Sequence, residues 1–257
     1  MHFFKMLFRS ALFLGYGAVY LHSRLRATGD PYGGYAQKPF LLFLIWLVFV
    51  VEMVQRFFPS QVESMGCQKQ FRRNFLPDEA VDKAEPLPGE RRGVALTVAA
   101  WLLLNGAIGG LYFLKLIDQG ILLLVSLAYS ICDMVCILYF CPFQSWFLKN
   151  KCCGTCRIYN WDYAMMFTPL IFIPNLFTWS LLVLALALLA EWEILYARHP
   201  ERFYELTNRS LRCEHCQEKL CRHKKSIRRF LLQHRSLLKV RLRQTLDRVK
   251  DKERDQS

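Results

Sequence analysis

Long apolar stretches with few or no charges alternate with short polar and basic segments along the chain. The clearest apolar runs cover residues 39–58, 94–116, 121–140 and 163–190, and a weaker run covers residues 11–21. A helix rises 1.5 Å per residue, so about 20 apolar residues are enough to cross about 30 Å of hydrocarbon. The pattern therefore predicts an all-α fold, a polytopic transmembrane helix bundle with four to five spans.

The last apolar run, residues 163–190, is longer than one straight crossing requires, and Pro174 and Asn175 interrupt it. Proline inside a helix removes a backbone hydrogen bond, so we expect a kink or a break there. The run is then either one crossing or a re-entrant hairpin that returns to the side from which it came. The hairpin places more of the short-loop Lys and Arg residues on the cytoplasmic side, so we favour it.

The polar stretches divide the chain into two predicted parts. Residues 1–196 form the expected transmembrane domain, with a polar loop at 59–93 and a cysteine-rich window at 141–162. Residues 197–257 form a basic tail, and the formal net charge of the whole chain is +13. Basic segments collect on the cytoplasmic side of membranes. We therefore expect a multi-pass protein of the plasma membrane with a cytoplasmic C-terminus.

Within the tail, apolar residues of the segment 226–250 recur three or four positions apart, with Arg and Lys between them. This spacing predicts a basic amphipathic C-terminal helix. We expect it to bind anionic lipid headgroups rather than nucleic acid, because the bilayer is the nearer partner. The alternative is a solvated helix that packs on its own protein. The predicted lipid-binding residues are Arg228, Arg229, Arg235, Lys239, Arg241 and Arg243.

Most of the ten cysteines lie in two short polar windows. The window in the tail offers four soft ligands, Cys213, Cys216, Cys221 and His223. Two cysteines three positions apart bind one ion through a tight turn, and a nearby Cys and His complete a tetrahedral zinc site. The alternative is a set of reduced cytosolic thiols in a basic linker.

The second cysteine window lies between two apolar runs. Cys153 and Cys156 form a CxxC pair, and Cys141 and Cys152 are further candidate ligands. Four thiolates suit zinc or an iron–sulfur cluster. A joint site that combines the two windows would clamp the tail to the membrane domain. No histidine lies inside an apolar run, so we expect no haem.

Two acidic residues lie within the apolar runs, Glu52 near the end of one and Asp133 in another. A carboxylate in a span is costly and commonly functional, although one near a helix end can reach the interface. Gly106 and Gly110 lie four positions apart in the run 94–116. Small residues at this spacing let two helices approach closely, which makes this face a candidate contact for a homo-oligomer.

Three classes of function fit these features. The favoured one is a non-enzymatic membrane module with cytoplasmic cysteine-ligated zinc or an iron–sulfur cluster, serving metal binding, redox or regulation. The second is a membrane thiol-disulfide oxidoreductase that uses Cys153 and Cys156. A helix bundle with CxxC at the start of its last span resembles quinone-linked disulfide-forming proteins and vitamin K epoxide reductases. That resemblance implies an extracytoplasmic CxxC and a second cysteine pair, whereas Cys67 stands alone. The third is a small transporter that uses Glu52 and Asp133.

Overall fold

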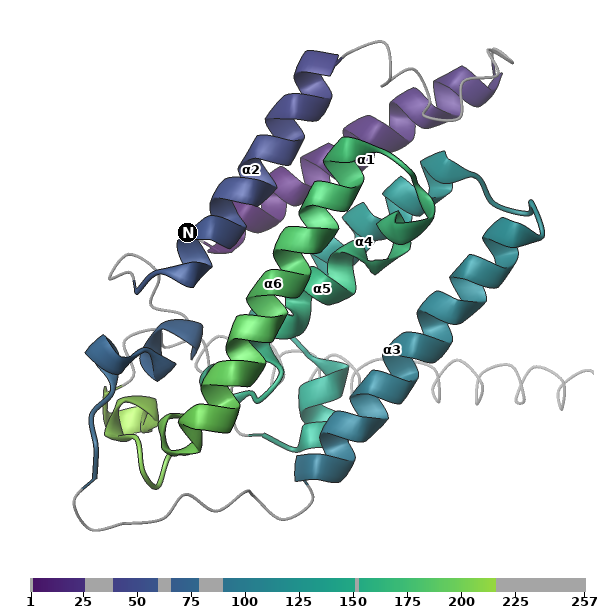
Figure 1. Cartoon of the computed structure of the whole chain (residues 1–257). Helices are drawn as coiled ribbons and strands as arrows, with labels where there is room; N and C mark the ends of the chain where they lie inside the picture. The colour runs from purple at the N-terminus through teal and green to yellow at the C-terminus, as the bar shows by residue number, and fades with distance from the viewer. Residues whose placement is uncertain (1, 26–38, 60–65, 79–89, 151–152, 216–257) are drawn as a thin grey trace, which may run out of the picture. The chain divides into compact units, whose positions relative to one another are not determined.

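The computed structural model describes residues 2–25, 39–59, 66–78, 90–150 and 153–215 (Figure 1). The described residues are helical, and their only strand-like pairing is a single bridge between Pro77 and Asn208. The α-helices of these ranges are α1 (His2–Leu25), α2 (Pro39–Phe57), α3 (Glu90–Phe113), α4 (Gln119–Leu138), α5 (Asp162–Phe167) and α6 (Leu176–Arg198). The predicted helical fold class is confirmed for this part of the chain.

Three of the described helices, α3, α4 and α6, are long and apolar enough to cross a membrane. This finding supports an integral membrane protein, whereas the larger predicted number of spans stays a prediction. By its contacts the chain divides into two compact units, Met1–Glu218 and Lys219–Ser257. The second unit lies outside the described residues, and so does the predicted amphipathic helix.

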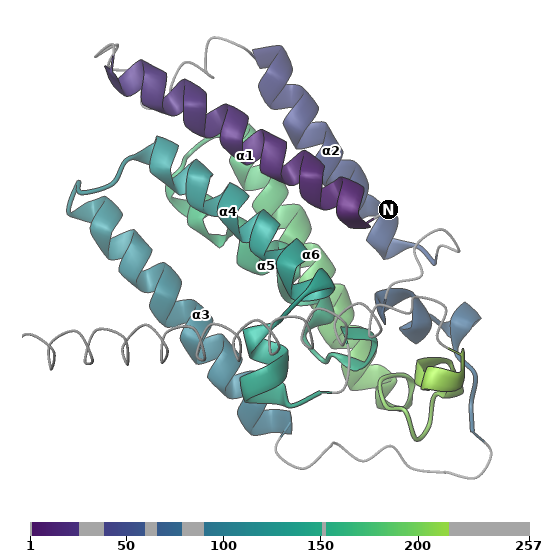
Figure 2. The ribbon, with the colours of Figure 1, turned by 180° about the vertical axis from the view of Figure 1, so that it is seen from behind.

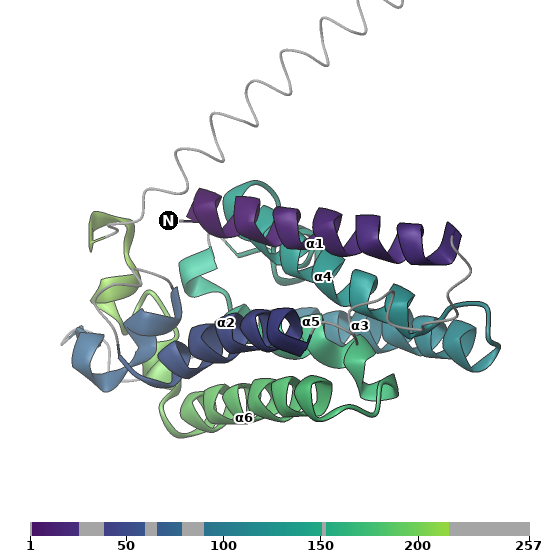
Figure 3. The same ribbon diagram turned by 90° about the horizontal axis from the view of Figure 1, so that it is seen from above.

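Successive helices of the first unit run between two ends of the bundle, as Figures 1 and 3 show. One end holds the N-terminus of α1 together with residues 66–78 and 199–215, and we call it the polar end. The other end holds the turn between α3 and α4. There Asp118 caps α4 through Ile121 N and pairs with Arg24 near the end of α1. Helix α1 thus lies along α4 (Figure 2).

The last apolar run breaks where the sequence predicts. Helix α5 continues into the 3-10 helix η7 (Thr168–Phe172), and Pro174 separates η7 from α6. Asn175 caps the new helix, because its Oδ1 accepts a hydrogen bond of 3.0 Å from Phe177 N. Residues 162–172 lead away from the polar end, where α5 starts, and α6 returns to it.

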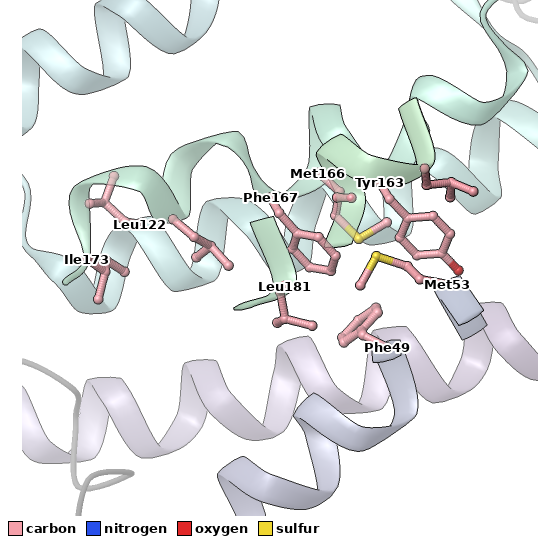
Figure 4. Packing of buried hydrophobic residues seen from close by; sticks show 11 residues of the cluster. Phe49, Met53, Leu122, Tyr163, Met166, Phe167, Ile173 and Leu181 are labelled. Carbon is pink, nitrogen blue, oxygen red and sulfur yellow. The ribbon is translucent and has the colours of Figure 1, made fainter. Parts of the chain in front are cut away.

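The hydrophobic core lies where α2, α4, α5 and α6 meet (Figure 4). Phe49 of α2 packs edge-on against Phe167 of α5, with 5.3 Å between the ring centres. Ser126 of α4 fixes α5 by donating a hydrogen bond of 2.6 Å to the carbonyl of Met166. Edge-on aromatic pairs add to the gain from burial. Besides Phe49 and Phe167, the core contains Met53, Leu122, Tyr163, Met166, Leu170, Ile173, Leu181, Ala185 and Leu188.

The glycines of α3 differ in what surrounds them. A Cβ added at Gly93 would lie 2.5 Å from the backbone oxygen of Phe147, in the π-helix η4 (Phe143–Leu148). Nothing lies within 4 Å of such an atom at Gly106 or Gly110. The predicted Gly106/Gly110 face is therefore open on this chain, and its contact with a second copy stays a prediction.

We expect Gly93→Ala to destabilise the protein by about 1–3 kcal/mol, because the backbone of η4 cannot yield without moving the whole turn. The matched control is Gly106→Ala, which should be neutral or stabilising by about 0.5–1 kcal/mol, since alanine favours a helix. Thermal unfolding of both variants in the same detergent measures the difference. Equal melting temperatures would show that α3 does not depend on this close approach.

Candidate functional site

The interior of the helix bundle, near its polar end, contains a network of charged side chains. At its centre is Arg9 of α1, only 2% exposed. Its guanidinium donates to Glu52 Oε2 at 2.9 Å and to Asp133 Oδ2 at 3.0 Å. It also donates to the backbone carbonyl of Ser130 at 3.0 Å. The two acids predicted from the sequence therefore meet at one arginine on a third helix.

Tyr163 extends this network to a second ion pair. Its hydroxyl donates to Glu52 Oε2 at 3.0 Å, and its ring lies 4.5 Å from the guanidinium carbon of Arg56. Arg56 pairs with Asp162, with 2.7 Å between Nη2 and Oδ2. Lys5 Nζ lies 3.5 Å from Glu52 Oε1. The network thus joins α1, α2, α4 and α5.

The charges of the network balance, because Lys5, Arg9 and Arg56 face the carboxylates of Glu52, Asp133 and Asp162. A buried charge is tolerated when it is paired and hydrogen-bonded, and it is expensive when one partner is missing. These contacts hold four helices together at one end of the bundle. We therefore call the network a structural clamp.

Sequence reasoning missed the arginines and the tyrosine of this network. The available signal was the position of Arg9 beside the apolar run 11–21, since a basic residue in a span usually pairs with an acid. The sequence predicts Glu52 and Asp133 as two separate polar sites, and nothing in its pattern indicates that they share a partner.

A second polar assembly, which we call the cap, consists of residues 66–78, 153–161 and 199–215. Asn208, which is 0% exposed, joins the first and the last of these segments. The side-chain amide of Asn208 donates to the carbonyls of Lys69 at 3.1 Å and Arg202 at 2.8 Å. Its Oδ1 accepts from the backbone N–H of Leu76 at 3.4 Å and of Ser210 at 3.1 Å.

Arg157 attaches the cysteine window to α6. Its guanidinium donates to both carboxylate oxygens of Glu193, with 2.8 Å between Nη1 and Oε1. Trp161 Nε1 donates to Glu193 Oε1 at 2.8 Å, and Trp192 Nε1 donates to the carbonyl of Arg157 at 2.8 Å. Burial alone lowers the pKa of Arg157, but the hydrogen bonds and charge of Glu193 outweigh it and raise the pKa. The guanidinium is therefore held in its charged form.

The structure describes only some of the predicted metal ligands. Cys156 is buried in the cap, and Cys213 is exposed in the 3-10 helix η10 (Cys213–His215). Cys141 follows α4, where its thiol is within hydrogen-bonding reach of Cys136. The backbone of Cys153 lies in the 3-10 helix η5 (Cys153–Thr155). The predicted residues outside the described ranges are Cys152, Cys216, Cys221, His223, Arg228, Arg229, Arg235, Lys239, Arg241 and Arg243.

Within the described ranges, no three His, Cys, Asp or Glu side chains are grouped so that they could hold a metal ion. Segments that contain or directly precede a cysteine nevertheless meet in the cap. The 3-10 helix η2 (Gly66–Gln70), which includes Cys67, contacts η5 through Gln70 Nε2 and the carbonyl of Gly154 at 3.4 Å. It also contacts η9 (Arg209–Leu211), which precedes Cys213. Cysteines far apart in sequence thus lie on neighbouring segments.

Comparisons with protein-family models, with curated proteins and with solved structures give no match. The geometry of the cap and of the charged network is therefore the basis on which a function can be assigned.

Proposed function

We propose that the protein is an integral membrane protein whose cysteine windows bind a metal ion at the polar end, as a regulatory or redox module rather than an enzyme. The observation that carries this proposal is that η2, which contains Cys67, contacts both η5, which contains Cys153, and η9, which ends two residues before Cys213. In a reducing compartment, clustered thiols are commonly used to bind metal. The proposed ligands are Cys213, Cys216, Cys221 and His223 in the tail and Cys141, Cys152, Cys153 and Cys156 in the window.

The contact between Arg157 and Glu193 supports a topology in which the residues before and after the last apolar run lie on one side of the membrane. These residues precede and follow the last apolar run, so a single straight crossing would separate them by the thickness of the bilayer. Their direct contact supports a hairpin, in which residues 162–172 re-enter and α6 returns. With α1 and α2 as further spans, the N-terminus, the cap and the basic tail then share one side, which we assign to the cytoplasm.

The same arrangement weakens the two alternative functions. A thiol-disulfide oxidoreductase of the predicted kind requires Cys153 and Cys156 on the side opposite the tail. A small transporter requires acids that can exchange partners, whereas Glu52 and Asp133 both accept hydrogen bonds from Arg9.

The ligand types bear on the identity of the proposed metal. A mixed Cys and His ligand set suits zinc, and an all-cysteine set suits zinc or an iron–sulfur cluster.

Lipid is the other partner that the fold supports. The apolar helices α3, α4 and α6 would contact acyl chains. We further propose that the basic segment 226–250 binds anionic headgroups, and that the open Gly106/Gly110 face packs against a second copy.

Metal analysis of the full-length protein, purified without oxygen, tests the main proposal. We expect stoichiometric zinc, or iron with visible absorption, and loss of that metal in Cys213→Ser and Cys216→Ser. The matched control is Cys132→Ser, because Cys132 lies on α4 outside both cysteine windows. A wild-type protein without bound metal, or equal loss in the control, would refute the proposal and favour thiol chemistry.

A further inference from the structure

A pocket of about 670 Å³ lies on the polar end, beside the last two turns of α6. Its other walls are residues 71–75 and the residues that directly follow α6. The volume is within the range of about 300–1,000 Å³ that is usual for small-molecule sites. Phe71, Phe75 and Ile194 give the lining an apolar part, and three arginines give it a basic part.

Two buried polar atoms of the lining have no hydrogen-bond partner among the described residues. They are Nε of Arg202, a donor, and Oε2 of Glu191, an acceptor. Buried polar atoms in native proteins almost always have a partner, so these two atoms are candidate contacts for an ordered water or a bound group. The other acid of the lining, Glu201, is paired with His199 at 3.0 Å. A group bound to both atoms would accept from Arg202 and donate to Glu191.

The charge of the pocket favours an anion. Arg72, Arg198 and Arg202 line it, and guanidinium groups bind phosphate through charge-assisted hydrogen bonds. Its location favours a lipid, because Arg198 is in the last turn of α6, where a candidate span ends. Ile194, one turn earlier on α6, is 51% exposed and offers an apolar surface for an acyl chain.

We propose that this pocket binds the headgroup of an anionic phospholipid that carries hydroxyl groups, of the phosphoglycerol type. The phosphate lies against Arg72, Arg198 and Arg202. A headgroup hydroxyl donates to Glu191, and an acyl chain follows α6 past Ile194. The site is separate from the cysteine windows and does not depend on the proposed metal.

The full-length protein in nanodiscs of mixed phosphatidylglycerol, phosphatidic acid and phosphatidylcholine tests this site, with native mass spectrometry to count the lipid retained. We expect retention of one phosphatidylglycerol molecule in preference to phosphatidylcholine. Arg72→Gln and Arg202→Gln should each reduce it about fivefold, since a basic residue near an anionic surface contributes about 1 kcal/mol. Glu191→Leu should remove the preference for phosphatidylglycerol over phosphatidic acid, which has no headgroup hydroxyl.

The matched control is Arg209→Gln, because Arg209 is an exposed arginine of the cap outside the pocket. The basic tail is present in every variant, so differences among the variants report on the pocket. Arg72 is exposed, and its replacement should leave the melting temperature unchanged. Equal retention of phosphatidylglycerol and phosphatidylcholine, equal loss in Arg209→Gln, or complete displacement of the lipid by free glycerol phosphate would each overturn the proposal.

Discussion

Arg9→Met is expected to lower the free energy of unfolding by about 3–5 kcal/mol, because it leaves buried carboxylates without their partner. Among the described residues Glu52 would keep Lys5 and Tyr163, and Asp133 would lose the guanidinium that binds it. Arg9→Lys should recover only part of the loss, since an ammonium group lacks the planar fork that serves several acceptors. Chemical unfolding in bicelles, followed by tryptophan fluorescence, measures the change.

Two controls separate the clamp from a general effect of losing an arginine. Arg24 is 59% exposed in its side chain and pairs with Asp118 at the other end of α1, so Arg24→Met should cost less than about 1 kcal/mol. The triple variant Arg9→Met, Glu52→Gln, Asp133→Asn removes the charges together and should recover most of the stability. If Arg9→Met cost no more than Arg24→Met, the network would not be a clamp.

The helices were largely predictable because their signals are local. The apolar runs 94–116 and 121–140 match α3 and α4, and Pro174 with Asn175 marks the start of α6. The packing of α5 and η7 was not predictable. A long uncharged run has the same composition whether it crosses straight or doubles back. Only a contact between the two ends of the run, such as that between Arg157 and Glu193, distinguishes the two paths.

The candidate sites were predictable only where a residue type is informative by itself. A carboxylate in an apolar run is rare, so Glu52 and Asp133 could be flagged, but their partner depends on how three helices pack. The cap was even harder to predict from the sequence. Residues 66–78 fall within the predicted loop 59–93, and residues 199–215 fall at the start of the predicted tail. Asn208 belongs to no periodic pattern, and its partners Lys69 and Leu76 are distant in sequence.

Asn208 leads to the other prediction with a large effect, because one buried side chain joins two segments of the cap, residues 66–78 and 199–215. Asn208→Ala removes the partners of the Lys69 and Arg202 carbonyls and of the Leu76 and Ser210 N–H groups. A buried group left without its partner costs about 1–3 kcal/mol, so the cap should lose about 3 kcal/mol or more. Hydrogen exchange of residues 69–78 and 202–212 should accelerate, while exchange in α3 and α4 stays slow.

The matched control is Asn105→Ala, another buried asparagine, whose side chain bonds only the Trp101 carbonyl of its own helix. It should leave exchange in the cap unchanged. Opening of the cap should also weaken lipid retention, because Asn208 fixes the backbone of Arg202 beside the pocket. Arg72→Gln should instead weaken lipid retention with the cap still protected from exchange. Unchanged exchange at residues 69–78 in Asn208→Ala would mean that the bridge between Pro77 and Asn208 and the ion pair between Asp78 and Arg212 suffice to hold the cap.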